Sequence, residues 1–228
     1  MLTEHIIRGI LAIVPVILAI TLHEVAHGYA ALALGDHTAR DQQRLSLNPL
    51  RHVDRMGTIV LPGFLLISQL LFPPHKVQFM FGWAKPVPVN PMVFRDPRRG
   101  MALVALAGPA MNFFLVWVVL LAIREVPEAH IAGRLNSMLY DFILVNMVLG
   151  LFNLLPVPPL DGGRVMVGLL PEALARSWAG LERYGLGIIL VFVLVLPQVF
   201  GISPINDALE VVLPAALTII QWLAGYDV

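Results

Sequence analysis

Long apolar runs alternate with short polar stretches along the chain. A transmembrane helix needs about 20 residues, and each run has about 17–29. Another, Gly57–Phe72, is shorter and ends at a pair of prolines. The pattern predicts an all-α polytopic membrane protein with about five to six transmembrane helices. The full-length runs are Ile6–Leu34, Gly100–Ile123, Leu135–Val157, Tyr184–Phe200 and Asp207–Ala224.

The composition supports a lipid environment. Of the 228 residues, 58% are apolar and 13% are charged, whereas soluble domains have about 45–50% and about 25%. Basic and acidic residues balance at 15 each, so no nucleic-acid partner is expected. There is no cysteine, which excludes disulfide scaffolds and thiolate metal sites. We expect residues 1–228 to form a single membrane-embedded domain, and nothing in the sequence specifies an oligomeric state.

Positive charges decide whether Gly57–Phe72 crosses the membrane, because Lys and Arg collect on the cytoplasmic side. If this segment does not cross and the amino terminus is outside, twelve of the 15 Lys and Arg residues lie inside and three outside. If it crosses, every later loop changes side, and six lie inside against nine outside. The segment is therefore predicted to be re-entrant or to lie in the membrane interface.

The residues after this segment have an extended character. Val77–Phe81 is rich in β-forming residues, and the prolines within Lys85–Val89 favour extended backbone. Non-helical backbone at membrane depth is tolerated only where it is buried in protein or lines a wet cavity. The sequence thus predicts a re-entrant or β-like segment, and a cavity, between the first two long helices.

The first apolar run carries the pattern HExxH at His23–His27. On a helix, residues i and i+4 share one face, so His23 and His27 can bind the same zinc ion. Glu24 lies beside them and can act as a general base toward a water molecule. Ionisable groups inside an apolar helix are costly and usually functional. We therefore interpret this cluster as a metal site.

A catalytic zinc site usually has three protein ligands, so one more is expected. Asp161 is the best candidate, because Pro156–Pro159 stop the preceding span and two glycines follow it. The predicted topology places Asp161 and the His23–His27 cluster toward the same inner face. The other carboxylates near apolar runs are Asp141, Asp207, Glu125, Glu128 and Glu210. Of these, Asp141, Asp207, Glu125 and Glu128 are predicted at the outer face.

The chain resembles the site-2 proteases, a family of zinc metalloproteases that cut inside the membrane. His23–His27 matches the HExxH motif, Gly108–Asn112 is similar to the GPxxN block, and Asn153–Gly163 is similar to the NxxPxxPxDG block. Gly82–Asn90 resembles a segment of the compact prokaryotic members. The resemblance covers about residues 20–165. No stretch is long enough for the PDZ or nucleotide-sensing domain that many members carry.

The resemblance implies that one Zn²⁺ is bound by His23, His27 and Asp161, and that Glu24 activates water. It also implies that Asn153 lies near the site and contacts the substrate backbone or the oxyanion. Asn112 is a weaker candidate for that role, since a buried Asn in a span more often forms a helix–helix hydrogen bond.

The extended stretch would bind an unwound substrate by strand pairing, with Lys85, Val87 and Val89 as the pairing residues. A helical substrate hides its peptide bonds, and strand addition exposes one. Arg95, Arg98 and Arg99 are interpreted as topology charges near lipid headgroups.

The sequence therefore predicts a zinc-dependent endopeptidase that cleaves single-span transmembrane proteins near the inner face of a prokaryotic plasma membrane. The protease core is expected at about residues 6–165, with accessory helices at about 184–224. A zinc or proton transporter is one alternative, although the inverted repeats and multiple polar spans typical of transporters are missing. A non-catalytic substrate-binding relative is another, which the intact Glu24 disfavours.

The charge distribution predicts how single cysteines will label. A cysteine at His75 should react from the same side of the membrane as one at Arg44, and cysteines at Thr3 and Glu128 from the opposite side. The cysteine-free chain makes membrane-impermeant thiol labelling a clean measurement. Labelling of His75 together with Glu128 would mean that Gly57–Phe72 is a true span.

Overall fold

The computed structural model describes residues 2–71, 82–126 and 133–227, and within these ranges the chain forms helices and irregular loops without a β strand. The all-α prediction is therefore confirmed for the described residues. The α-helices are α1 (Leu2–Ala33), α2 (Thr38–Asp41), α3 (Leu61–Leu71), α4 (Pro97–Ile123), α5 (Arg134–Asn153), α6 (Asp161–Leu169), α7 (Glu172–Ala179), α8 (Gly185–Leu190) and α9 (Pro204–Leu223). The 3-10 turns are Pro49–His52, Pro91–Val93 and Glu182–Tyr184, and π-helical turns span Arg55–Val60 and Val191–Phe200.

Four helical stretches in the described part of the chain are long and apolar enough to cross a membrane. Most of the segment Gly57–Phe72 lies in a shorter apolar helical stretch, Arg55–Leu71. The predicted last span corresponds to α9, which carries Asp207 and Glu210 and is not among the four. A total of five to six spans stays a prediction. The four stretches are Ile13–Ala33, Pro97–Ile123, Leu135–Asn153 and Glu172–Phe200.

The ends of α4 and α5 follow from the local sequence. Asp96 caps α4, because its carboxylate accepts the backbone amides of Arg98 and Arg99, and Pro97 occupies the first turn, where no amide partner is needed. Helix α5 ends at Asn153, three residues before the first of the prolines at 156–159. These boundaries leave Asp161 free to begin a new helix.

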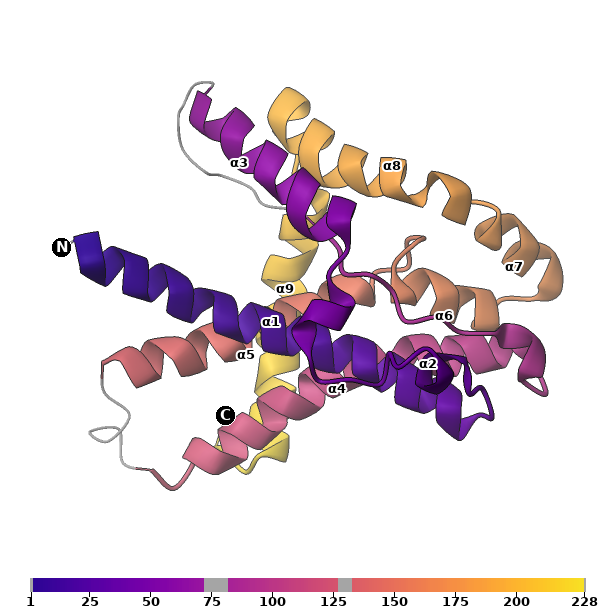
Figure 1. The fold of residues 1–228 in the computed structure, drawn as a ribbon, viewed down its shortest axis with the longest axis horizontal. Coiled ribbons are helices and arrows are strands. Elements are labelled where there is room, and N and C mark those ends of the chain that lie inside the picture. The colour runs from indigo at the N-terminus through magenta and orange to yellow at the C-terminus, as the bar shows by residue number, and fades with distance from the viewer. Residues whose placement is uncertain (1, 72–81, 127–132, 228) are drawn as a thin grey trace.

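Helices α1 and α4 are antiparallel neighbours. His23 contacts Asn112, whereas His27, one turn later in α1, contacts Val104, two turns earlier in α4. Ala31 and Val104 share a buried cluster still closer to the end of α1. Figure 1 shows these helices beside α5, with α2 and α6 near the end where α1 finishes and α4 begins. This pairing brings the HExxH residues against the GPxxN block.

A second buried cluster joins the other halves of α4 and α5 to α9. It is formed by Val116 and Leu120 of α4, Met147 of α5, and Ile220 with Ala224 at the end of α9. Because side chains inside a bilayer gain little from leaving lipid, close packing of this kind holds the helices together. The last helix is thereby fixed to the same scaffold that carries the HExxH residues.

The chain between α1 and α4 leaves and returns at the same end of the molecule, because these helices are antiparallel. Helix α3 lies within this connection, and Figure 1 shows it extending away from α4. The stretch Val77–Phe81, for which β character is expected, lies outside the described residues. Residues 82–90 are described and form no strand. The re-entrant placement of Gly57–Phe72 stays a prediction.

The structure refines the choice of labelling positions. Arg44 is buried with 7% of its surface exposed, so a cysteine there would react slowly from either side. The neighbouring Gln43 is exposed and serves as the reference position instead. His75 and Glu128 lie outside the described residues.

Candidate metal centre

Three ligand-type side chains from two distant segments meet in the interior. The Nε2 atoms of His23 and His27 lie 3.0 Å apart, as expected for residues one turn apart on α1. Asp161, the first residue of α6, places Oδ2 3.1 Å from Nε2 of His23 and 3.3 Å from Nε2 of His27. One ligand atom from each residue lies within 4.8 Å of the others.

The hydrogen bonds behind the two imidazoles fix which nitrogen faces the group. Nδ1 of His23 lies 2.7 Å from the side-chain oxygen of Asn112, and Nδ1 of His27 lies 2.7 Å from the carbonyl oxygen of Val104. Both oxygens are acceptors, so each Nδ1 carries a proton and donates it. In a neutral imidazole the other nitrogen then presents a lone pair.

When both imidazoles are neutral, as metal binding requires, the group consists of two imidazole lone pairs and a carboxylate, with no proton among them. Oδ2 of Asp161 is buried and accepts no hydrogen bond from the described residues. Unpaired buried acceptors this close together repel one another, and a cation removes the repulsion. Two neutral His nitrogens and one carboxylate oxygen are the ligand set of several catalytic zinc sites, so the residues present fit Zn²⁺.

Gly108 of α4 provides the space that the imidazoles occupy. A Cβ atom at this position would lie 2.5 Å from Cε1 of both His23 and His27, which is closer than real Cβ contacts permit. The GPxxN block thus has glycine at position 108 for a steric reason, because any side chain there would collide with the two imidazole rings. The asparagine of the same block, Asn112, orients one of them.

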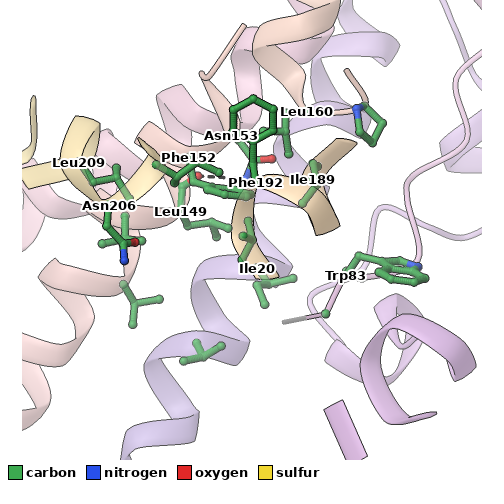
Figure 2. Close-up of a pocket in the computed structure, with 18 of the residues that line it drawn as sticks. Ile20, Trp83, Leu149, Phe152, Asn153, Leu160, Ile189, Phe192, Asn206 and Leu209 are labelled. Carbon is green, nitrogen blue, oxygen red and sulfur yellow. Dashed lines mark hydrogen bonds between the residues drawn. The ribbon is translucent and has the colours of Figure 1, made fainter. Parts of the chain in front are cut away.

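A cavity of about 910 Å³ opens beside the group. His23 and Glu24 line it together with apolar side chains of α5 and of the stretch 186–197, and α9 contributes Asn206 and Leu209 (Figure 2). Gly82, Trp83 and Ala84 line it as well. Glu24 also accepts a hydrogen bond of 3.1 Å from the backbone amide of Val87. A carboxylate beside the three ligands thus faces a largely apolar cavity.

Comparison with known proteins agrees with this geometry. Residues 121–196 match the model of peptidase family M50. A Bacillus subtilis (strain 168) protein named "Putative zinc metalloprotease YwhC" is 37% identical over 185 residues, which cover 78% of each chain. The chain belongs to peptidase family M50, the site-2 proteases.

Two further relatives carry similar names. The Mycolicibacterium smegmatis protein "Putative zinc metalloprotease Rip2" is 30% identical over 189 residues, covering 81% of this chain and 67% of the relative. The Methanocaldococcus jannaschii "Zinc metalloprotease MJ0392" is 30% identical over 121 residues, covering 53% and 34%. No solved structure gives a significant match. This M50 peptidase is a metallopeptidase with zinc as its cofactor and apolar helices suited to a membrane.

The two asparagines predicted near the site of the M50 peptidase have different positions. Asn153 lines the cavity, and its amide donates to the carbonyl of Leu149, one turn earlier in α5 (Figure 2). Asn112 is completely buried behind His23, and its amide donates to Asn146 of α5 at 2.9 Å. It forms the helix–helix hydrogen bonds expected of a buried Asn. Asn112 does not line the cavity, and its predicted contact with substrate stays a prediction.

The predicted pairing strand is already hydrogen bonded within the peptidase. The amide of Lys85 donates to the carbonyl of His52 at 2.8 Å, and the amide of Val87 donates to Glu24. Val89 packs beside the buried cluster of Ala31 and Val104. Pro86, the one residue between Lys85 and Val87, carries no N–H group, so the amides of Lys85 and Val87 could pair with a substrate only after these two bonds break.

Arg98 has a role that sequence reasoning missed. Its guanidinium donates to the carbonyl of Val167 at 3.0 and 3.2 Å, and also to that of Leu170, at the C-terminal end of α6. The interpretation of Arg98 as a topology charge is therefore incomplete: it binds the end of the helix that begins with Asp161. Its neighbour Arg99 is exposed and has only Asp96 as an ion-pair partner among the described residues. No local pattern distinguishes these two arginines.

Replacing Asp161 by Asn should lower zinc affinity more than about 100-fold, since loss of an outer hydrogen-bond partner alone costs about 10–100-fold in metal sites. Asp141→Asn is the control, because Asp141 is not part of the cluster of His23, His27 and Asp161. Zinc content and affinity of the purified variants measure the effect. Full zinc affinity in Asp161→Asn would refute the ligand assignment.

Replacing Gly108 by Ala should weaken zinc binding by roughly tenfold or more, because the new methyl group displaces both imidazoles. Gly187→Ala is the matched control, since a Cβ there meets nothing within 4 Å. Zinc titration in detergent checks this expectation. Equal affinities of the two variants would show that the imidazoles can move without loss.

Proposed function

We propose that this peptidase hydrolyses peptide bonds of single-span transmembrane proteins within the bilayer, near its inner face, in a prokaryotic plasma membrane. In this proposal His23, His27 and Asp161 hold one zinc ion, and Glu24 is the general base. The observation that carries the proposal is the position of three buried ligand atoms at the side of a cavity lined mainly by apolar residues.

The cavity suits an apolar segment of a substrate. Most of its lining comes from Leu, Val, Ile and Phe side chains. An apolar transmembrane segment can exchange its contacts with lipid for contacts with these side chains. Asn153 lies in the same lining and is the one asparagine of the predicted pair that a substrate backbone could reach. We therefore assign to Asn153 the role of a hydrogen-bond donor to substrate, exchanging its bond with Leu149.

The chemistry follows from the residues around the ligand group. A bound zinc ion would supply Lewis acidity, polarising the scissile carbonyl and lowering the pKa of a nearby water molecule. Glu24 accepts the proton of the attacking water and delivers it to the leaving amine. The amide of Val87 occupies one oxygen of Glu24 and leaves the other for the proton. Asn112 and Val104 hold the imidazoles in the tautomer that ligation requires.

The inner-face location rests on the charge distribution. Twelve of the 15 Lys and Arg residues lie inside when the connection between α1 and α4 makes no net crossing. The antiparallel pairing of α1 and α4 agrees with that arrangement. His27 lies late in α1, so the ligand group belongs to the inner half of the bilayer in this orientation.

We further propose that residues 1–228 work as a single membrane domain with a core of about residues 6–165. The accessory stretch 184–224 then forms one wall of the substrate cavity, through side chains such as Phe192 and Leu209. Membership of a peptidase family favours hydrolysis over the transporter and the non-catalytic binding protein that the sequence left as alternatives.

Glu24→Gln is the decisive variant. Glutamine keeps an oxygen for the Val87 amide but cannot take a proton from water, so turnover should fall by about 10²–10⁴-fold while zinc stays bound. Mass spectrometry of membrane proteins in the native host should show single-span proteins accumulating with Glu24→Gln, relative to the parent strain. Their cleavage sites, mapped in the parent, should lie toward the inner face. Normal turnover of those proteins by Glu24→Gln would contradict the assignment of the base.

A further inference from the structure

The segment that lines the cavity beside Glu24 is held through its backbone amides. Trp83 donates to the carbonyl of Gly57 at 3.1 Å, and Asn90 donates to the carboxylate of Asp36 at 2.7 Å. Between these ends, the Lys85 amide donates to His52, and the Val87 amide donates to Glu24. The position of Val87 therefore determines where one oxygen of Glu24 lies.

A buried arginine holds the peptide group just before this contact. Arg44 follows α2, is 7% exposed, and donates from Nη2 to the carbonyl of Lys85 at 2.6 Å. Burial lowers the pKa of the Arg44 guanidinium, and the negative charge of Glu24 offsets this only in part. No carboxylate forms an ion pair with Arg44 in the described part of the chain. Burying a charge is costly, and the carbonyl of Lys85 is the group that compensates for it.

Pro86 makes the connection between Arg44 and Glu24 rigid. The carbonyl of Lys85 belongs to one planar peptide group, and the amide of Val87 belongs to the next. The two planes meet at Pro86, whose ring fixes φ, so a single torsion angle separates them. Holding the first plane therefore largely fixes the second. Pro88 comes after the Val87 amide and has no place in this connection.

The same elements pack together on α1. A Cβ atom at Gly28 would lie 2.4 Å from Cδ2 of Leu45 and 3.2 Å from Cγ1 of Val87. Leu45, the neighbour of Arg44, and Val87, the donor to Glu24, thus both pack against Gly28, the residue after His27. This close approach keeps the loop and the segment in a fixed relation to the HExxH helix.

We propose that Arg44 is a positioning residue for Glu24. It holds the Lys85 carbonyl, and through Pro86 it fixes the Val87 amide that binds one oxygen of the base. This inference rests on the proposed role of Glu24. Arg44 is not among the residues that line the cavity.

The first test compares Arg44→Met with Arg40→Met, which removes an exposed arginine whose one ion-pair partner among the described residues is the neighbouring Asp41. Cleavage of unfolded β-casein in detergent gives kcat and KM. Arg44→Met should lower kcat by about 10–100-fold with KM within about twofold, because a misplaced base slows chemistry more than binding. Zinc content should not change, Arg44→Lys should recover part of the loss, and Arg40→Met should match the parent. A kcat of Arg44→Met within about twofold of the parent overturns the inference.

The second test replaces Pro86 or Pro88 by glycine, and this comparison can be interpreted even if Arg44→Met does not fold. Pro86→Gly frees the torsion between the two peptide planes and should lower kcat as Arg44→Met does, whereas Pro88→Gly should have a smaller effect. Arg44→Met combined with Pro86→Gly should be no slower than the slower single variant, since both break one connection. Equal effects of the two proline variants, or losses that multiply in the double variant, overturn the inference.

A measurement without substrate separates this inference from the proposed function. Hydrogen exchange of the Val87 amide, followed by mass spectrometry, should be about tenfold faster in Arg44→Met and Pro86→Gly than in the parent, Arg40→Met and Pro88→Gly. Unchanged exchange refutes the role of Arg44 whatever the activity shows. If the parent protein cleaves neither casein nor any membrane protein, the proposed function fails, and exchange at Val87 still decides the role of Arg44.

Discussion

Three buried lone pairs that repel one another are the constraint on which the rest of the structure depends. His23, His27 and Asp161 converge within 4.8 Å in the interior, where solvation by water cannot offset their repulsion. A bound cation removes this repulsion, and neighbouring residues hold the three ligand atoms in place. Asn112 and Val104 direct the lone pairs inward, Gly108 leaves room for the rings, and Arg98 holds the far end of α6.

The antiparallel pairing of α1 and α4 is the geometric condition for this convergence. It places the residues 104–112 beside 23–27, so that one face of α4 supplies two hydrogen-bond acceptors and the missing side chain at Gly108. Asp161 comes from a third segment, after α5 has ended and the chain has passed its prolines. The connection between α1 and α4 then supplies the segment that contacts Glu24.

The sequence predicts the parts of this site that depend on short-range spacing. Two histidines four residues apart on a helix must share a face, and an Asp after a proline-rich stop must begin a new segment. The helices themselves follow from the length of the apolar runs. What the sequence does not reveal are contacts between residues far apart in the chain, such as Arg44 with Lys85 or Arg98 with Val167. Arg98 and Arg99 look alike in sequence, and only the packing of α6 against α4 distinguishes them. Asn112 was expected to have two possible roles, and its complete burial and its hydrogen bond to Asn146 fit the helix–helix role.

The residues of the proposed metal site and those of one cavity wall come from different segments of the chain. The proposed metal ligands and base come from α1 and the start of α6, and α4 and the segment 82–90 contact them, whereas Phe192, Asn206 and Leu209 of the cavity lining come from residues 192–209. Mutations of these cavity residues would change the shape of the cavity without moving the residues proposed to bind the metal. An M50 peptidase built in this way can therefore acquire new substrates through changes in its carboxy-terminal helices alone, while its reaction chemistry stays constant.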